Sequence, residues 1–326
     1  MSGAGLRRRT ALATATMVIG ANLPDVDAIV YLMGDNADGL AFRRGWTHGV
    51  LAMAVLPFVL TAIMYAVGRA IERRQSRRNR PATRIPLRAP QLLLVSAFSI
   101  WSHPLFDLLN TYGVRLFMPF SSRWFYGDAL FIIDPWVWCA LGLGATISIQ
   151  RARRVPVGAD TTTVMARASR PARVALMAVG IYIAIMAASS QIGRIVVERQ
   201  AVASGRSPSE RVMVAPEPLI PFRRSVVRDI GTGYETGWFT WSFSPRYAAD
   251  PSVITALTDT SAAYRVASST RAGRRFLIWS RFPFVDDSAA GDTSAMRLDD
   301  ARYGGPGRAS FASVTVPRAR PLAPQP

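Results

Sequence analysis

The chain has 326 residues, of which 50% are hydrophobic and only 18% are charged, and its mean hydropathy is +0.17. Soluble domains usually carry about a quarter charged residues, so this composition excludes a disordered chain and favours one that lies largely in lipid. The single cysteine excludes a fold held by disulfides. The formal net charge is +18, but the arginines lie in blocks between apolar stretches, so we expect no binding of nucleic acid.

Five apolar segments are each close to the roughly 20 residues that an α-helix needs to cross a bilayer. The segments cover residues 11–33, 50–68, 91–109, 129–149 and 174–197. We therefore predict a membrane α-helical bundle of about five transmembrane helices, in which proline and aspartate interrupt the first and fourth. An alternative for residues 1–21 is a signal peptide, with Arg7, Arg8 and Arg9 as its charged region.

Arginine-rich loops follow the second and fourth segments, whereas the loops at residues 34–47 and 110–128 have nearly balanced charge. By the positive-inside rule the arginine-rich loops are cytoplasmic, so the chain after the fifth segment is predicted to be extracytoplasmic. The composition is rich in alanine and contains arginine without lysine, which indicates a GC-rich bacterial genome. We therefore predict a multi-pass protein of the bacterial inner (cytoplasmic) membrane.

The sequence changes character after about residue 200. Short aromatic and β-branched runs, such as residues 238–243 and 275–279, alternate with clusters of Gly, Pro, Asp and Ser. These runs predict strands. We expect residues 1–200 to form the transmembrane domain with the functional site, residues 201–316 a small β-rich extracytoplasmic domain, and residues 317–326 a flexible tail.

The chain contains only two histidines, and both lie at the predicted outer ends of apolar segments. His103 and Asp107 are four residues apart, so on a helix they share one face and can bind one ion. Two alternatives remain open at this stage. His48 could be a polar residue at the membrane interface, and His103 with Asp107 could form only a hydrogen bond along the helix.

Three aspartates are predicted at the same level of the membrane. Asp25 and Asp27 follow a proline in the first segment, and Asp134 opens the fourth. A carboxylate in a bilayer costs on the order of 3 kcal/mol, so several at one depth need a compensating partner. A divalent metal ion is such a partner, although Asp25 and Asp134 could instead cap helices.

We therefore predict one divalent metal ion, expected to be zinc, at the outer membrane face. Its candidate ligands are Asp25, Asp27, His48, His103 and Asp107. A metal-bound water would be the nucleophile, and a carboxylate not used as a ligand, from Asp25, Asp27 or Asp134, would orient it or accept its proton. Four arginines of the outer loops are predicted to pair with substrate phosphate, or alternatively with lipid headgroups: Arg43, Arg44, Arg115 and Arg123.

The first half of the chain resembles the YdjM-like inner-membrane proteins, which are usually described as membrane-bound metal-dependent hydrolases. The resemblance lies in residues 19–27, 44–49, 103–107, 110–114, 119–120 and 133–136. Family members typically carry a Thr-His pair before the first span, and that histidine is implied as a further ligand. Residues 1–6 contain no histidine. We therefore expect either a start codon placed too late or a copy that lacks one ligand.

The order Asp, His and then His-x-x-x-Asp also looks like one zinc site of the zinc-dependent phospholipase C class. That likeness implies a phosphoester substrate, and the absence of further histidines implies one metal ion or at most a reduced cluster. The predicted function is hydrolysis of a phosphoester in a lipid-like molecule, with membrane lipids as the expected partners. A transporter or ion pathway, and a non-catalytic scaffold with a structural metal, are the alternatives.

Overall fold

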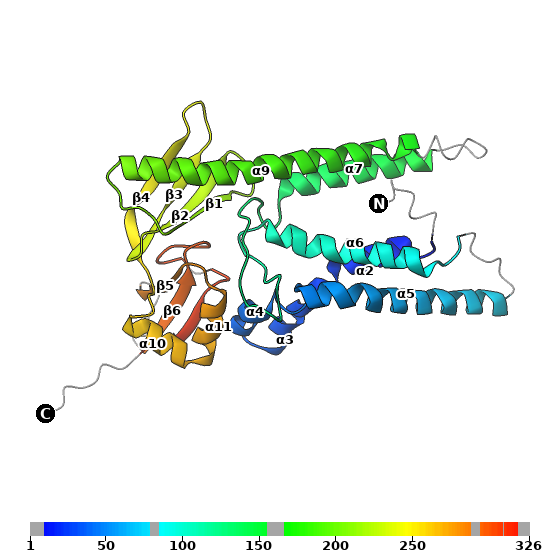
Figure 1. The fold of residues 1–326 in the computed structure, drawn as a ribbon, viewed down its shortest axis with the longest axis horizontal. Coiled ribbons are helices and arrows are strands. Elements are labelled where there is room, and N and C mark those ends of the chain that lie inside the picture. The colour runs from blue at the N-terminus through cyan, green and yellow to red at the C-terminus, as the bar shows by residue number, and fades with distance from the viewer. Residues whose placement is uncertain (1–9, 79–84, 155–165, 288–293, 309, 319–326) are drawn as a thin grey trace. The chain divides into compact units, whose positions relative to one another are not determined.

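The computed structural model describes residues 10–78, 85–154, 166–287, 294–308 and 310–318 (Figure 1). The predictions for Arg7, Arg8 and Arg9, for parts of both arginine-rich loops and for the tail beyond residue 318 lie outside these residues. Two compact units make up the chain. The first comprises Met1–Val26, Arg44–Gly127 and Ile132–Ile185, and the second Asp27–Arg43, Asp128–Phe131 and Met186–Pro326. The predicted domain boundaries at residues 200 and 316 are a separate question from these two units, and they stay a prediction.

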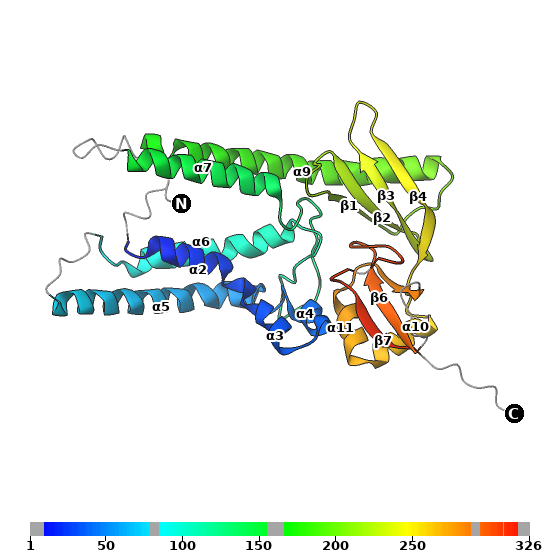
Figure 2. The same ribbon diagram turned by 180° about the vertical axis from the view of Figure 1, so that it is seen from behind.

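Three helices form the core of the first unit: α2 (Ala13–Asn22), α5 (Val50–Arg77) and α6 (Ala89–Leu108). Helix α6 packs against both α2 and α5 (Figures 1 and 2). Leu60 and Met64 of α5 form one apolar cluster with Leu92 and Ile100 of α6. The buried face of α6 also carries serines, so this core is partly polar.

The predicted interruption of the first apolar segment is confirmed. Helix α2 ends before Pro24, because proline has no N–H to continue the helical hydrogen bonds and its ring clashes with the preceding turn. A 3₁₀ helix, η2 (Pro24–Ile29), and a single turn, α3 (Val30–Met33), follow. This break places Asp25 in a 3₁₀ turn rather than on a continuous helix face.

The prediction of about five spans is confirmed only in part. Among the described residues, two helices are long and apolar enough to cross a membrane, α5 and α9 (Arg170–Ala203), and the broken helix around Pro24 makes a third if it is one span. Helices α6 and α7 (Pro135–Arg153) are not in this set. Polar residues lower the hydropathy of both: serines and a histidine in α6, and arginines in the last turn of α7.

The fourth segment begins later than predicted. Residues 129–134 precede α7 instead of belonging to it, and the helix starts at Pro135. Asp134 caps α7, because its Oδ1 accepts hydrogen bonds from the backbone N–H groups of Trp136 and Val137, at 3.0 and 3.1 Å. The capping alternative for Asp134 is therefore confirmed.

Two antiparallel sheets in the second unit confirm the predicted β-rich region. The first is a meander in the order β1-β2-β3-β4, and the second has the order β5-β6-β7. The strands are β1 (Arg211–Pro216), β2 (Arg223–Asp229), β3 (Gly233–Thr240), β4 (Arg246–Thr255), β5 (Pro283–Asp286), β6 (Ala295–Asp300) and β7 (Val314–Pro317). Three helices of this unit are α4 (Asn36–Phe42), α10 (Ala262–Ser269) and α11 (Arg271–Trp279).

Both faces of the first sheet are covered within this unit. On one face, Val214, Val226 and Phe239 pack against Val197 of α9. On the other face, Met213, Val227, Tyr234 and Ile254 pack with Phe282 and Phe284. Successive strand residues point to opposite faces, so neighbouring apolar residues such as Met213 and Val214 of β1, or Val226 and Val227 of β2, supply both of these clusters.

The strand predicted at residues 275–279 is wrong, because this run belongs to helix α11. Its buried residues are Gly273, Phe276 and Trp279, which are spaced three apart as on one face of a helix. The Thr270 side chain caps the helix by accepting a hydrogen bond from the Gly273 N–H. The run at residues 238–243 is a strand as far as Thr240.

Candidate metal centre

His103 lies near the end of α6, and one of its ring nitrogens is hydrogen-bonded to the backbone. Its Nδ1 is 2.7 Å from the carbonyl oxygen of Ala21. A carbonyl only accepts hydrogen bonds, so Nδ1 carries a proton and the Nε2 of the neutral ring keeps its lone pair. Metal-binding histidines are held in this way. Gly20 permits the close approach of α2, because a Cβ there would lie 2.1 Å from the Ser99 Oγ.

His48 is fully buried in the turn that leads into α5. The Thr47 Oγ1 lies 3.0 Å from its Nδ1, so this ring is also oriented through the nitrogen that is remote from the site. Gly49 follows as the N-cap of α5, where a Cβ would lie 2.4 Å from the Met118 carbonyl oxygen. Glycine at this position lets the start of α5 lie against the loop around Met118, and the Val50 N–H donates to the Leu116 carbonyl oxygen there.

The Nε2 atoms of both histidines face the carboxylates of Asp25 and Asp107. His48 Nε2 lies 3.8 Å from Asp25 Oδ1 and 3.2 Å from Asp107 Oδ2. His103 Nε2 lies 3.6 Å from Asp25 Oδ2 and 3.5 Å from Asp107 Oδ2. Ligand atoms of Asp25, His48 and His103 all lie within 4.8 Å of one another.

These separations fit a shared metal ion better than they fit hydrogen bonds. N–H···O hydrogen bonds measure about 2.7–3.2 Å, so three of the four distances are too long for one, and the 3.2 Å from His48 Nε2 to Asp107 Oδ2 is at the upper limit. Ligand atoms about 2.0–2.2 Å from a tetrahedral zinc ion lie roughly 3.3–3.6 Å from one another. Two imidazole nitrogens and two carboxylate oxygens are also a donor set that zinc accepts. The residues therefore fit a divalent metal ion.

A buried arginine, Arg44, positions Asp107 through the carboxylate oxygen that does not face the histidines. Arg44 Nη2 lies 3.0 Å from Asp107 Oδ1, and Arg44 Nη1 donates a hydrogen bond of 2.9 Å to Asn110 Oδ1. The guanidinium also lies over the Tyr112 ring, 4.7 Å from its centroid. Since Oδ1 is bound to Arg44, Oδ2 is the oxygen presented to both histidines. Arg44 has a φ of 54°, a left-handed conformation that is strained for a residue with a side chain.

A family model described as YdjM inner membrane protein matches residues 1–192, which include every residue of this centre. The chain belongs to the YdjM inner membrane protein family. Comparison with curated proteins and with solved structures finds no match. The family match confirms the resemblance found in the sequence, and it assigns this YdjM-family protein to the inner membrane.

Two predicted carboxylates of the YdjM-family protein have other partners. Asp27 is buried and pairs with Arg43, at 3.5 Å between Oδ1 and Nε. Asp134 accepts the two backbone hydrogen bonds that cap α7, and its Oδ2 accepts a third, of 3.1 Å, from the Tyr182 hydroxyl. Neither belongs to the group of Asp25, His48 and His103, whose ligand atoms lie within 4.8 Å of one another. Asp107 is also outside that group, but its Oδ2 lies 3.2 and 3.5 Å from the two Nε2 atoms. Their catalytic roles, and the role of Asp27 as a ligand, stay predictions.

The four arginines predicted to bind substrate differ in accessibility. Arg44 is buried and holds Asp107, and Arg115 is buried over the Trp124 ring, 4.8 Å from its centroid. Arg43 faces Asp27, whereas Arg123 is exposed and lies 5.3 Å from the centroid of the Phe125 ring. Binding of phosphate by any of the four stays a prediction, and Arg123 is the most accessible of them.

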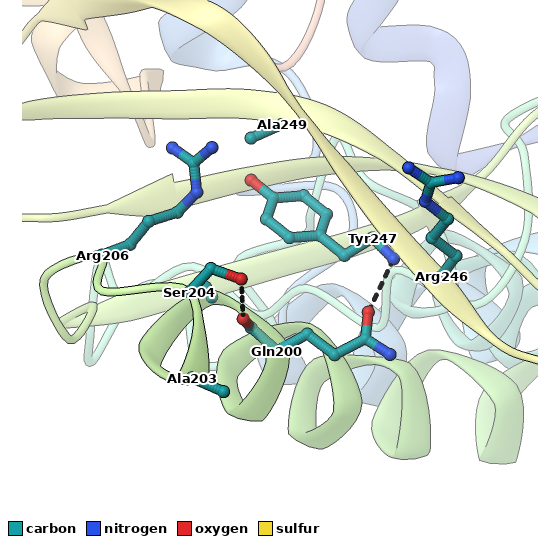
Figure 3. Close-up of a pocket in the computed structure, with 8 residues that line it drawn as sticks. Gln200, Ala203, Ser204, Arg206, Arg246, Tyr247 and Ala249 are labelled. Carbon is teal, nitrogen blue, oxygen red and sulfur yellow. Dashed lines mark hydrogen bonds between the residues drawn. The ribbon is translucent and has the colours of Figure 1, made fainter.

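A pocket of about 330 Å³ lies apart from the histidines, between the end of α9 and β4 (Figure 3). Its polar side chains largely bind the protein itself: Gln200 donates to the Pro245 carbonyl oxygen and accepts from the Tyr247 N–H, and Ser204 donates to the Gln200 carbonyl oxygen. Burial, together with the Glu235 carboxylate, raises the pKa of Tyr247 to about 12. Tyr247 therefore stays protonated, and the pocket supplies no base.

Sequence reasoning missed the groups that orient the ligands. The Ala21 carbonyl has no signal, because every residue has a carbonyl group. Asn110 did have a signal in the sequence. An Asn followed by a Gly three residues later is typical of a turn in which the Asn side chain accepts hydrogen bonds from backbone N–H groups. Its Oδ1 indeed accepts from Tyr112 N and Gly113 N, at 2.9 and 3.3 Å, in addition to Arg44.

Proposed function

We propose that this YdjM-family protein is a metal-dependent hydrolase in which Asp25, His48, His103 and Asp107 hold one zinc ion. The observation that carries the proposal is the convergence of two imidazole Nε2 atoms and two carboxylates at 3.2–3.8 Å. His103 supports it most directly, because its proton lies on the nitrogen remote from the carboxylates. With the His103 ring neutral, its Nε2 lone pair faces carboxylate oxygens, and a cation between them would remove that repulsion.

The accessibility of Asp25 favours a catalytic centre. The Asp25 side chain is 42% exposed, whereas His48 is fully buried and Asp107 is nearly so. Zinc with an open position supplies a bound water whose pKa is lowered toward neutrality. On this chain, Asp25 would hold the ion at the exposed edge of the centre and, as the most exposed of the four side chains, would be the carboxylate that accepts a proton there. Asp27 and Asp134 would take this role only if their present partners released them.

The proposed substrate is a phosphoester of a lipid-like molecule, reached from the outer face of the bacterial inner membrane. This proposal is supported by the membrane family and by the arginine asymmetry of the loops, which favours a β-rich region outside the cytoplasm. Arg123 is exposed in the same loop region that follows α6 and would pair with phosphate. Membrane lipids are the proposed partners.

A structural metal site is the second candidate, and one observation favours it. Four protein ligands fill a tetrahedral zinc site, and closed sites of this kind hold helices together without catalysis. X-ray absorption spectroscopy of the zinc protein separates the two. A coordinated water beside three or four protein ligands supports the hydrolase, and a complete protein shell without water supports the scaffold.

Metal analysis of detergent-purified protein tests the centre itself. We expect about one equivalent of zinc in the wild type and none in a His103→Ala and Asp107→Ala double variant that elutes as a folded protein. Hydrolysis of phospholipid-like phosphoesters is then compared between the wild type and His103→Ala. Zinc binding that survives the double variant would refute the site, and full activity in His103→Ala would refute its catalytic role.

A further inference from the structure

The loop between β1 and β2 presents apolar side chains to its surroundings. Leu219 and Phe222 are 68% and 57% exposed, and Pro218 and Pro221 restrict the loop around them. Single exposed apolar residues are common on protein surfaces, but two within one six-residue loop form a local patch. The β2–β3 turn, at the opposite end of the same strands, instead carries Gly231 and Thr232.

Contacts along α9 place this loop beside the apolar part of that helix. Near the start of β2, Arg224 donates a 2.9 Å hydrogen bond to the Ser190 Oγ and contacts the Met186 carbonyl oxygen at 3.4 Å. Near the end of β2, Arg228 pairs with Glu198, at 3.1 Å. The strand therefore runs along α9 from Met186 toward Glu198, and the loop before Arg223 lies at its Met186 end.

Met186 and Ser190 belong to the apolar segment 174–197, in the helix that is long and apolar enough to cross the membrane. The loop that precedes Arg223 therefore lies beside the second half of the stretch of α9 between Arg173 and Arg194, which carries no charged residue. Arg223 follows the apolar residues directly and lies over the Trp238 ring, 4.0 Å from its centroid. Aromatic side chains with an adjacent arginine are typical of the headgroup region, where arginine pairs with anionic phospholipid.

We propose that the β1–β2 loop is a membrane anchor that inserts Leu219 and Phe222 into the leaflet from which α9 emerges. The lipid bilayer, and not another protein, is the partner of this patch. Arg223 stays at the headgroup level and binds lipid phosphate. The anchor fixes the height of the first sheet above the membrane. It depends on the span of α9 and is independent of any metal or catalysis at the histidines.

Site-directed fluorescence in lipid nanodiscs tests the anchor on the full chain. Cys139 is the only cysteine, so a Cys139→Ser background accepts single cysteines by Leu219→Cys, Phe222→Cys and, as the matched control, Thr232→Cys in the opposite turn. All three positions are exposed, so the substitutions should leave the fold intact. Each cysteine receives an environment-sensitive NBD label, in discs of phosphatidylethanolamine and phosphatidylglycerol.

We expect emission at shorter wavelength from positions 219 and 222 than from 232. Spin-labelled phospholipid should quench the first two and spare the third, and aqueous iodide should quench only position 232. Equal iodide quenching at all three positions would overturn the proposal. Positions 219 and 222 that are shielded from iodide but not quenched by the lipid label would also overturn it, because that result indicates a protein contact, such as a second copy.

Discussion

Replacing Gly20 by alanine should weaken the metal centre, although residue 20 is not a ligand. A Cβ at this position would lie 2.1 Å from the Ser99 Oγ and 3.1 Å from both the Ser99 Cβ and the Leu60 Cδ2. The next residue, Ala21, supplies the carbonyl that fixes the His103 ring at 2.7 Å. Any shift of α2 away from α6 therefore lengthens the contact that orients a proposed ligand.

The size of the effect follows from these distances. Ordinary contact begins near 3.4 Å, so about 1.3 Å must be absorbed by movement of α2 or by rotation of Ser99. Rotation sacrifices the 2.8 Å hydrogen bond from Ser99 to the Val95 carbonyl oxygen, worth about 1 kcal/mol, and leaves the 3.1 Å contacts. Overpacking costs about 1–3 kcal/mol, and the better helix propensity of alanine returns up to about 1 kcal/mol.

We therefore expect Gly20→Ala to lower the free energy of unfolding by about 1–2 kcal/mol. Zinc affinity should fall about tenfold, at the lower end of the range for contacts that orient metal-binding histidines. Affinity is measured by chelator competition on detergent-purified protein. Gly142→Ala on α7 is the matched control, because a Cβ there meets nothing within 4 Å. Adding Ser99→Gly to Gly20→Ala removes the clash and should restore binding, whereas wild-type affinity in Gly20→Ala alone would refute the reasoning.

Three further predictions address other parts of the structure. Asn110→Ala leaves Arg44 and two backbone N–H groups without their shared acceptor, so stability should fall by about 1–3 kcal/mol and zinc affinity should fall as well. Asn110→Asp keeps the acceptor and should retain both, and equal losses in the two variants would contradict this account. Asp134→Ala removes the α7 cap, so thermal unfolding should show a loss of about 1 kcal/mol, with unchanged zinc content. Loss of zinc in that variant would place Asp134 at the metal. Burial opposes ionisation of Asp300, but the Arg302 guanidinium and hydrogen bonds lower its pKa to about 2. Because this pKa is depressed, its stabilisation of about 2 kcal/mol is present above about pH 4 and is lost as the pH falls toward 2. Asp300→Asn should flatten that acid limb of the stability curve, and an unchanged limb would contradict the assignment.

The candidate ligands could be predicted because polar residues are rare in apolar segments. Two histidines and the spacing from His103 to Asp107 indicate one level of the bundle from the sequence alone, and the described residues bring these groups together with Asp25. The end of a helix could be predicted equally directly from proline, since α2 ends just before Pro24, where the sequence predicts a break. Backbone groups and turn side chains that orient the ligands could not be found in this way, because their role depends on which segments become neighbours.

The strand wrongly predicted at residues 275–279 shows that a stretch of five residues is too short to identify a helix from its sequence pattern. A run of Arg-Phe-Leu-Ile-Trp has high β propensity, and within five residues a period of two cannot be distinguished from a period of three or four. Burial of Gly273, Phe276 and Trp279 shows the helical period only when the window extends to the Thr270 cap. Tertiary packing of this face then overrides the local preference.

Helix α6 explains why the hydropathy of a helix and its position in a membrane protein can disagree. Its serines at 96 and 99 are buried against neighbouring helices, and its outward face carries Leu94, Phe98 and Leu105, all exposed. An average over the helix adds both faces, so the buried polar groups lower the value. Residues of the candidate metal centre, His103 and Asp107, and the serines of the close helix packing thus contribute to keeping α6 out of the set of candidate spans. In a bundle built around a polar site, the helix nearest the site is the one that composition alone underestimates.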